Sequence, residues 1–460
     1  MRVRQKHACR KSATAWRHAS HSVLLACAMG WIATGTAYGE TLRQVVETAL
    51  KTHPRVLAAD AQRRAAAQDL AQAQAGFFPT VDLNLASGKE HTETPQVRAT
   101  GTDSANLTRR EAGLTLSQKL FDGKATASEI DRQTARVNAA ASRLAEVREE
   151  IALKATEGYL EVLKNRQLVK LANDNLKAHL QTREKVRLRV EGGVAQKTDL
   201  QQAQGRVALA KSIASARAGR LREAEANFQA TVGKAPADLD DPGAKATETV
   251  KSGAINTALL AQAIKQASET AITSSPALST ANAEISAAEA SVRGAKAPFY
   301  PRLNLELSAN RNENLAGIKG NYDSEALMLV LRWNLFRGGA DQAQERALAE
   351  RRYAAIDAAA NTRRDVEERV AVALHAKATS EERLAYLQEH ASLSAEVLDS
   401  YQQQLELGRR SLLDVLNAEN ELFTARSNHV AGRYEDLFNQ YAVEAAKGLL
   451  VNSLGIAPAD

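Results

Sequence analysis

Residues 53–85 read HPRVLAADAQRRAAAQDLAQAQAGFFPTVDLNL, and residues 275–307 read SPALSTANAEISAAEASVRGAKAPFYPRLNLEL. At a constant offset of 222 residues, Pro79 of the first stretch matches Pro301 of the second. Each stretch has an alanine-rich part, then an aromatic pair followed by proline, then alternating apolar and polar residues. The chain therefore carries an internal duplication, and each copy is predicted to pass from a helix into a strand.

The duplication continues through the rest of each copy. The sequence LFDG at residues 120–123 matches LFRG at residues 335–338, and Asp199 matches Asp414, both at an offset of 215 residues. The change of offset falls between two short alternating segments, where a loop tolerates a change of length. Each copy is thus predicted to contain a helix, a strand, a loop, a returning strand, a long helix, a turn and a second helix.

The N-terminal residues have the features of a secretory signal. Residues 1–39 begin with basic residues, contain no acidic residue, and continue with an apolar run from Val23 to Ala33. A stretch rich in small residues then leads to Glu40. The apolar run is too short to serve as a membrane-spanning anchor. We therefore predict a signal peptide that is cleaved before Glu40.

Removal of the signal changes how the charge and the cysteine content of the chain are interpreted. The full sequence has 60 Lys and Arg against 54 Asp and Glu, and six of the basic residues lie in the signal, which leaves 54 of each. The basic pI of the whole chain is thus no evidence for a nucleic-acid partner. Both cysteines, Cys9 and Cys27, also lie in the signal. We expect neither a disulfide framework nor thiol chemistry in the processed chain.

Two windows without proline predict very long helices. Residues 124–191 and 340–407 are each 68 residues long and rich in Ala, Glu, Arg and Leu. A continuous helix of that length spans about 100 Å. Glycine follows each run, which is typical of a helix C-terminus. A second helix is expected to begin near Asp199 in the first copy and near Ser411 in the second, so each copy contains an antiparallel helical hairpin.

These features divide the chain into five segments. We expect a signal peptide over residues 1–39, a first structural repeat over residues 40–232, a linker over residues 233–255, a second repeat over residues 256–447 and a C-terminal segment over residues 448–460.

Four short segments alternate with a period of two residues. Val81, Leu83 and Leu85 are separated by polar residues, and the same pattern recurs from residue 303 and in both returning segments. One apolar and one polar face is typical of a half-buried strand. Alternation alone also fits a small sheet of a soluble protein. The polar stretches between the strands, residues 88–110 and 308–324, are expected to be loops.

Aromatic residues favour a membrane location for these strands. They gather at the helix-proximal ends of the alternating segments: Phe77, Phe78, Phe121, Phe299, Tyr300, Trp333 and Phe336. Aromatics at one level beside apolar-out, polar-in strands are typical of the interface of a transmembrane barrel. Strand edges cannot stay open in lipid, so four strands per chain require closure by several chains. Two chains would give eight strands, and three would give twelve.

These residues resemble the TolC family of outer-membrane efflux and secretion channels. The resemblance covers residues 40–457 and rests on FFPTVDLNL and FYPRLNLEL, on LSQKLFDG and RWNLFRGG, and on the turn sequences GGVAQKTDLQQA and GRRSLLDVLNAE. It implies a mostly α-helical chain that forms a homotrimer in the outer membrane of a Gram-negative bacterium. Such a trimer has a twelve-stranded barrel in the lipid and a helical tube in the periplasm.

The resemblance also implies partners. In that family the trimer works with a periplasmic adaptor and with an inner-membrane ABC or proton-driven transporter, and it catalyses nothing. The LFDG and LFRGG sequences lean towards protein secretion with an ABC transporter, while the substrate itself is not readable from the chain.

The resemblance further assigns roles to the two hairpin tips. It places a pore-lining gate at Thr198, Asp199, Arg410, Asp414 and Asn417. It places adaptor docking at Gly193, Val194, Lys197, Gly408, Arg409 and Ser411. Two positions depart from the pattern of the family, because Asn417 stands where a second acidic residue is usual and Leu405 stands where a tyrosine is usual. The gate implied here has one acidic ring, with Arg410 as a tether.

A simpler interpretation of the same residues is helix capping. Ser411 and Asp414 have the spacing of a capping box, in which Asp414 satisfies a free amide at the helix start. Thr198 and Asp199 are suited to similar work at the other tip, and acidic side chains are favourable there in any case. Capping and pore lining are compatible roles for one residue, and both remain open.

The sequence contains no motif that supports catalysis. It has no phosphate-binding glycine-lysine loop, HExxH, paired CxxC or GxSxG sequence, and its histidines are scattered. We therefore expect no enzyme activity, cofactor or metal site. Two alternatives to a channel are a periplasmic adaptor and a coiled-coil scaffold. An adaptor would have one hairpin between compact β domains, and a scaffold would need no aromatic-bounded strand pairs.

Overall fold

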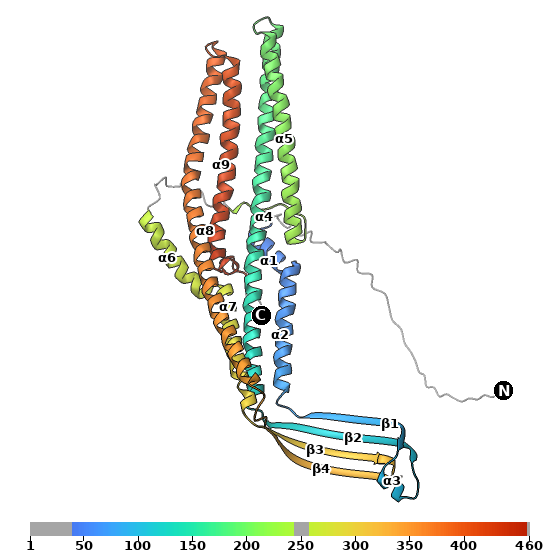
Figure 1. Ribbon diagram of the computed structural model, residues 1–460. Coiled ribbons are helices and arrows are strands. Elements are labelled where there is room, and N and C mark those ends of the chain that lie inside the picture. Colours follow the sequence, from blue (N-terminus) through green and yellow to red (C-terminus); the bar gives the residue numbers. More distant parts are fainter. Residues whose placement is uncertain (1–38, 243–256, 458–460) are drawn as a thin grey trace, which may run out of the picture. The chain divides into compact units, whose positions relative to one another are not determined.

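A computed structural model describes residues 39–242 and 257–457 (Figure 1). The predicted signal therefore lies outside the described residues except for Gly39, as do residues 243–255 of the predicted linker and the last three residues of the chain. The first repeat contains α1 (Leu42–Thr52), α2 (Pro54–Ala75), β1 (Thr80–Thr92), α3 (Pro95–Ala99), β2 (Ala105–Phe121), α4 (Ala125–Glu191) and α5 (Lys197–Val232).

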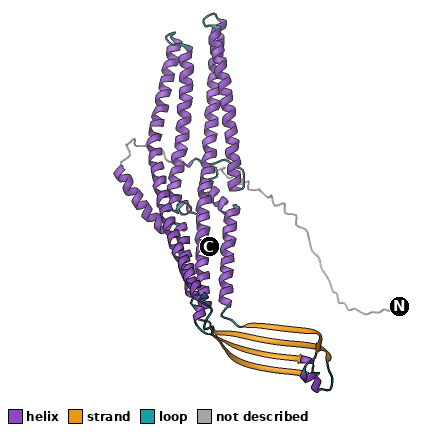
Figure 2. Cartoon of the chain, in the orientation of Figure 1, coloured by secondary structure: helices purple, strands orange, loops and turns teal. Residues whose placement is uncertain are grey.

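The second repeat has the same order of main elements. It contains α6 (Thr257–Ser274), α7 (Pro276–Gly294), β3 (Arg302–Glu313), β4 (Asn321–Arg332), α8 (Ala340–Glu406) and α9 (Leu412–Ala446), followed by α10 (Leu450–Ser453). The short 3-10 turns η2 (Ala297–Phe299) and η3 (Leu315–Gly317) flank β3. The predicted duplication, the mostly helical class and the two long helices are thus confirmed (Figure 2).

The strands form one antiparallel sheet in the order β1-β2-β3-β4. The pairing continues well beyond the apolar part of each strand, because Thr92 still pairs with Ala105 and Glu313 with Asn321. The predicted loops over residues 88–110 and 308–324 are therefore too long, because both ends of each range belong to strands. Polar residues lack the apolar alternation, but their backbone amides and carbonyls extend the ladder equally well.

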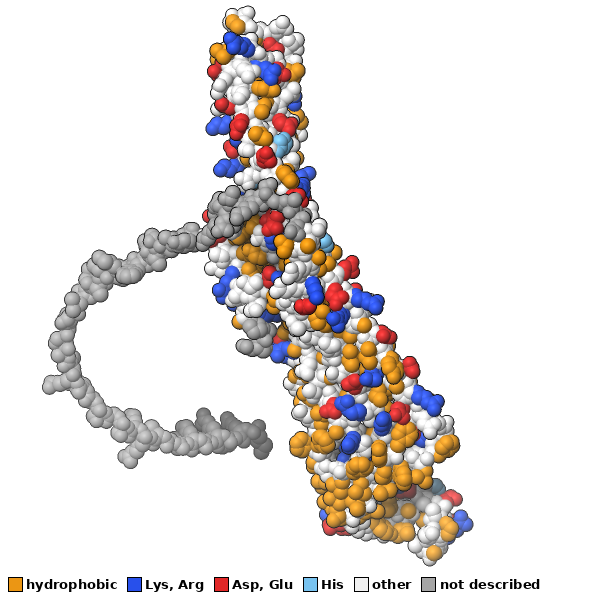
Figure 3. All heavy atoms as spheres, turned by 90° about the vertical axis from the view of Figure 1, so that its left-hand side faces the viewer, with side chains coloured by type: hydrophobic (Ala, Val, Ile, Leu, Met, Phe, Trp, Pro, Cys, Tyr) orange, Lys and Arg blue, Asp and Glu red, His pale blue; other side chains and the backbone are white. Residues whose placement is uncertain are grey.

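The two faces of the sheet differ sharply in polarity. On one face, Val81 pairs with Leu116, Leu116 with Leu307, and Leu307 with Leu327, so that apolar side chains run across all four strands. The row next to it, through Thr115 and its partners, belongs to the opposite face and is polar. Most of the apolar side chains are exposed, and hydrophobic atoms gather at the sheet end in Figure 3. A half-buried sheet on a soluble core is not what the chain forms.

The helices pair as two hairpins. α4 packs along α5, α8 packs along α9, and α4 also contacts α9, which brings the two hairpins side by side. α2 and α7 pack on α4 near the sheet. Each long helix begins just after a strand and ends at its hairpin tip, so the tips lie at the far ends of the helices from the sheet. None of the helices described has both the length and the apolar character needed to cross a membrane.

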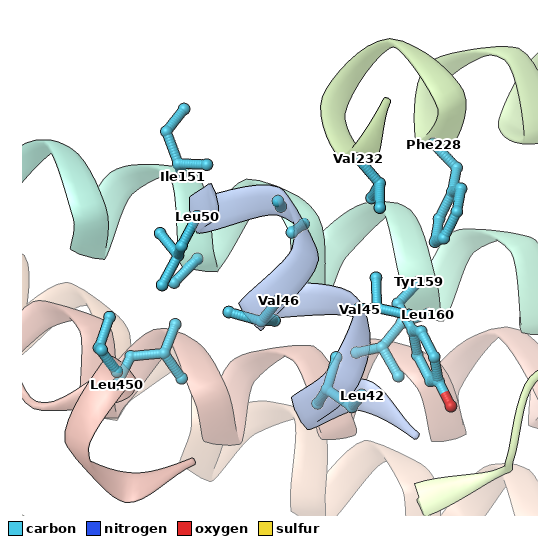
Figure 4. Close-up of a cluster of buried hydrophobic side chains, with 14 of the residues drawn as sticks. Leu42, Val45, Val46, Leu50, Ile151, Tyr159, Leu160, Phe228, Val232 and Leu450 are labelled. Carbon is cyan, nitrogen blue, oxygen red and sulfur yellow. The ribbon is translucent and has the colours of Figure 1, made fainter. Parts of the chain in front are cut away.

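The main hydrophobic core surrounds α1, about midway along α4. Val45, Val46 and Ala49 of α1 are fully buried against Ile151 and Tyr159 of α4 (Figure 4). α5, α9 and α10 close the same cluster. Thr41 begins α1 with a capping box, in which its hydroxyl accepts from the Gln44 amide. The core thus fixes the level at which the start of the described chain, both hairpins and the C-terminal segment meet.

The start of the linker after α5 and the C-terminal segment after α9 both pack against this core. Residue Leu239, after α5, is buried and forms a parallel bridge with Glu40. At the other end, the Glu149 carboxylate accepts from the amides of Leu450 and Val451 at 3.0 and 3.1 Å. Burial still raises the pKa of Glu149, because the loss of hydration outweighs those two amides.

Tyr159 offers a test of this arrangement. Its hydroxyl lies 2.9 Å from the Glu40 carbonyl oxygen and also contacts the Asp240 carbonyl, and burial raises its pKa. Tyr159→Phe should lower the free energy of unfolding by about 1 to 3 kcal/mol, because buried carbonyls lose their donor. Thermal unfolding followed by circular dichroism would show this loss. Tyr353→Phe keeps the ring of an exposed tyrosine whose hydroxyl has no hydrogen-bond partner in the described part of the chain, and it should have no effect. Equal losses in the two variants would contradict the role of Tyr159.

Candidate functional site

The two hairpin tips are built by the same turn. Gly193 and Gly408 have φ of +74° and +70°, which suits glycine because other residues are strained there. The next amide in each case donates back five residues, from Val194 to the Arg189 carbonyl and from Arg409 to the Gln404 carbonyl, both at 2.9 Å. This is the Schellman ending of an α-helix. The glycines end the long helices as predicted.

At the second tip, Ser411 caps α9. Its hydroxyl accepts from the Asp414 amide at 3.2 Å and donates to the Asp414 carboxylate at 2.9 Å. The prediction that Asp414 satisfies a free amide is therefore wrong, because its carboxylate binds the Ser411 hydroxyl rather than a backbone N–H. Asp414 still lies in the first turn of α9, where negative charge is favourable. Its side chain is 41% exposed and free to face solvent.

Arg410 is held by its own chain. Its guanidinium carbon lies 3.9 Å from the centroid of the Tyr401 ring, and its Nε lies 3.8 Å from Asp414 Oδ2. Contacts of this kind are attractive through the ring quadrupole. Sequence reasoning missed Tyr401, which lies one helical turn before Leu405, the position where the family's tyrosine was expected. The spacing of four residues was the signal that could have found it.

The first tip is capped differently. The Asp199 carboxylate accepts from the Gln196 amide at 3.2 Å, which is the capping role predicted for it. Thr198 does not cap the helix, because its hydroxyl contacts only the Gln196 side chain, at 3.4 Å. Gln196 rather than Thr198 is the residue that precedes α5, and this shifts the boundary that the sequence suggested.

One hydrogen bond joins the two tips. Arg206 of α5 donates from Nη2 to Asn417 Oδ1 of α9 at 2.8 Å. The structure thus places the predicted residue Asn417 against the first hairpin, while Arg410 and Asp414 stay together at the second. Within the described residues, no hydrogen bond or ion pair joins Asp199 to the second tip. Arg206 was missed because its partner lies in the other repeat.

Exposed side chains cover the outer surface of both tips. Val194, Leu407 and Leu413 are 72%, 71% and 47% exposed, although they are apolar. Lys197 and Arg409 are exposed beside them, and no ion pair is recorded for either within the described part of the chain. By contrast, Arg187 in the last turns of α4 forms ion pairs with Glu184 and Glu191. These carboxylates raise the pKa of Arg187 and balance its positive charge. The tips therefore offer apolar contacts next to free positive charge.

The predicted aromatic residues lie at one end of the sheet. Phe77, Phe78, Phe299 and Tyr300 precede β1 and β3, Phe121 ends β2, and Trp333 and Phe336 follow β4. All seven are at least 40% exposed. Trp333 donates from Nε1 to the Phe299 carbonyl at 3.3 Å, so the ring is fixed while its face remains open. Across residues 39–242 and 257–457, no group of three or more His, Cys, Asp or Glu is arranged to hold a metal ion.

Comparison with known proteins agrees with this geometry. The model of the family described as outer membrane efflux protein matches residues 45–234 and 267–449, which is most of the chain and both repeats. The chain is 25% identical over 432 residues to the outer membrane efflux protein BepC of Brucella suis, a match that covers 93% of this chain and 90% of BepC.

Two further comparisons extend this match. The chain is 22% identical over 408 residues to the proteases secretion protein PrtF of Dickeya chrysanthemi, covering 87% of this chain and 86% of PrtF. Among solved structures, it superposes on CusC with a TM-score of 0.75 at 17% identity, covering 88% of this chain and 92% of CusC. The CusC structures are described in terms of transmembrane channel formation, and at this identity the likeness concerns the fold.

Proposed function

Since this chain belongs to the outer membrane efflux protein family, we propose that three copies of it close a single channel. The protein is an outer-membrane efflux channel protein that extends into the periplasm, and its family and fold are those of channels and not of enzymes. The adaptor alternative receives no support from the comparisons. In this proposal residues 1–39 are the signal that directs the chain out of the cytoplasm, and the two repeats on either side of the linker contribute equivalent parts of the channel.

The observation that carries the trimer is the open sheet. β1 and β4 are its two edges, and neither is paired on its outer side within the described chain. One face is apolar and exposed, as a lipid-facing surface must be. Unpaired amides and carbonyls are too costly in lipid to remain open, so β4 of one chain pairs with β1 of the next. Three chains of four strands give a closed ring of twelve.

The helices supply a second contact between copies. Val372, Tyr386 and Leu393 of α8 are 60%, 55% and 51% exposed and are spaced by 14 and 7 residues. Residues at multiples of seven lie along one face of a helix and form the seam of a coiled coil. The exposed seam of α8 is where a helix of the neighbouring copy would pack, which continues the ring into a tube.

Planar lipid bilayers test the channel proposal directly. The purified protein should produce stepwise, long-lived ionic currents after insertion, because the polar face of the sheet and the interior of the tube enclose water. Absence of currents from protein that is folded and inserted would contradict a channel. The same preparation with sodium and chloride gradients would report which sign of ion the lumen prefers.

The tips are the surface proposed for docking. Their apolar side chains and the free charges of Lys197 and Arg409 suit a periplasmic adaptor, which would connect the trimer to an inner-membrane ABC or proton-driven transporter. The names of relatives mention both efflux and protease secretion. In this proposal the partner transporter, rather than this chain, determines which class of substrate is exported. The residues Gly193, Val194, Gly408 and Ser411 would shape this surface through the turns described above.

Charge reversal at the tips tests the docking surface. Lys197→Glu and Arg409→Glu should abolish copurification with the adaptor while leaving the trimer intact, because both side chains are exposed and unpaired. Reversal at an exposed lysine remote from the tips, Lys51→Glu, serves as the control. Loss of the trimer in the tip variants would show that the tips are structural, and unchanged copurification would show that docking lies elsewhere.

A further inference from the structure

A buried contact between a histidine and a carboxylate joins the two hairpins, away from their tips. His179 of α4 lies with its Nδ1 2.8 Å from Oε2 of Glu419 on α9, and both side chains are only 4% exposed. Nothing in the sequence connects the two residues, because they belong to different repeats. α4 and α9 form most of the contact between the two hairpins, and α5 also contacts α9.

The surroundings of this pair are dry. Thr182 donates its hydroxyl to the other carboxylate oxygen of Glu419 at 2.9 Å. Val186 lies two helical turns closer to the tip than His179 on α4, Val415 lies one turn closer than Glu419 on α9, and both are buried as well. His179 Nδ1 and Glu419 Oε2 do not form an aligned hydrogen bond with each other, and within the described residues neither of these two atoms has another hydrogen-bond partner. The two groups are therefore held close together inside the seam, where neither side chain is exposed to solvent.

Buried polar groups resist sliding of the helices that carry them. If α4 moved along α9 while the interface stayed dry, both side chains would lose their partner, and a buried polar group without a partner is unfavourable. An exposed pair imposes no such restriction, because water replaces the partner. The His179–Glu419 pair is thus suited to fix the register of one hairpin against the other.

We propose that the His179–Glu419 pair is a register pin that confines opening of the channel to the segments beyond it. These segments are the last 12 residues of α4 and the first seven residues of α9, and the α4 segment is about 18 Å long. Asn417, which accepts a hydrogen bond from Arg206 of α5, precedes Glu419 and so lies within the movable segment of α9. This role rests on the proposed channel function, because it describes which part of the channel moves.

Distance measurements by pulsed electron paramagnetic resonance test the pin. The processed chain has no cysteine, so spin labels at Asp174→Cys on α4 and Thr424→Cys on α9 report one distance inside one chain. The full-length protein in lipid nanodiscs, diluted with unlabelled chains, should show a single narrow distance. Glu419→Gln and His179→Gln should each lose that single maximum, because neither variant retains the buried contact between a histidine and a carboxylate.

Two controls separate the pin from general damage. Glu421→Gln removes the partner of His390, which lies 3.1 Å away in an exposed pair, and should leave the distance unchanged. The swapped variant His179→Glu with Glu419→His places the same two groups in exchanged positions and should recover the narrow distance. An unchanged distance in Glu419→Gln, or a swapped variant as broad as the single ones, would overturn the proposal. Because the distance lies within one chain, loss of the trimer would count against the channel and not against the pin.

Discussion

Leu327→Arg is expected to remove most of the protein from the outer membrane. Leu327 lies in the row of apolar side chains that crosses all four strands and is 68% exposed in the single chain. An arginine on the lipid face near the middle of the membrane costs about 2 to 4 kcal/mol. The trimer would carry three of them. Fractionation of membranes followed by detection of the protein measures the loss.

The neighbouring residue provides a matched control. Met328 follows Leu327 on the same strand, is also exposed, and pairs with Glu306 on the opposite face of the sheet. Met328→Arg therefore introduces the same charge into the proposed aqueous interior and should leave insertion nearly unchanged. If both variants insert equally well, the apolar face does not meet lipid. If only Met328→Arg fails, the two faces of the sheet have been assigned the wrong way round.

Asp414→Ala is expected to raise the conductance of the channel and to lower its preference for cations. In the proposed trimer, three Asp414 carboxylates form one acidic ring at the tips, and such rings attract cations and exclude anions. Without it, the permeability of cations relative to anions should fall several-fold at low salt, where charges are least screened. Single-channel recordings and reversal potentials in a salt gradient measure both effects.

Ser411→Ala separates pore lining from capping. It removes the hydroxyl that caps α9 and contacts Asp414, at a cost of about 1 kcal/mol, but it keeps the carboxylate. If Asp414 lines the pore, Ser411→Ala should leave ion preference unchanged. Equal behaviour of the two variants would mean that Asp414 acts only through the structure of the tip. Arg410, held between Tyr401 and Asp414, is the residue whose freedom would change in both.

The long-range order of the chain could be predicted because it depends on simple periodicities. The windows without proline identify α4 and α8 to within one residue, and alternation identifies the four strands. The ends of the strands could not be predicted from this alternation. Beyond Ser87 and Ser308 the side chains no longer alternate, yet the backbone ladder continues, because pairing requires only amides and carbonyls. The sequence pattern reports contact with lipid more directly than it reports hydrogen bonding.

The candidate site was predicted only where its residues are neighbours along the chain. Ser411 and Asp414 were found through their spacing, although only the Ser411 half of the predicted capping box forms. Arg206 with Asn417, and His179 with Glu419, each join one repeat to the other. Nothing in the local sequence pattern distinguishes a polar side chain between the two hairpins from one in solvent. Contacts between the hairpins could therefore be identified only from the three-dimensional structure.

In the proposed channel, three chains close one barrel in the outer membrane. The most direct test of this closure is the mass of the native assembly, measured by mass spectrometry after gentle extraction of the outer membrane with detergent. Closure by three chains predicts a species of three processed chains that persists at low protein concentration, because every strand edge is paired in the ring. A monomer or dimer that is released without detergent would contradict it.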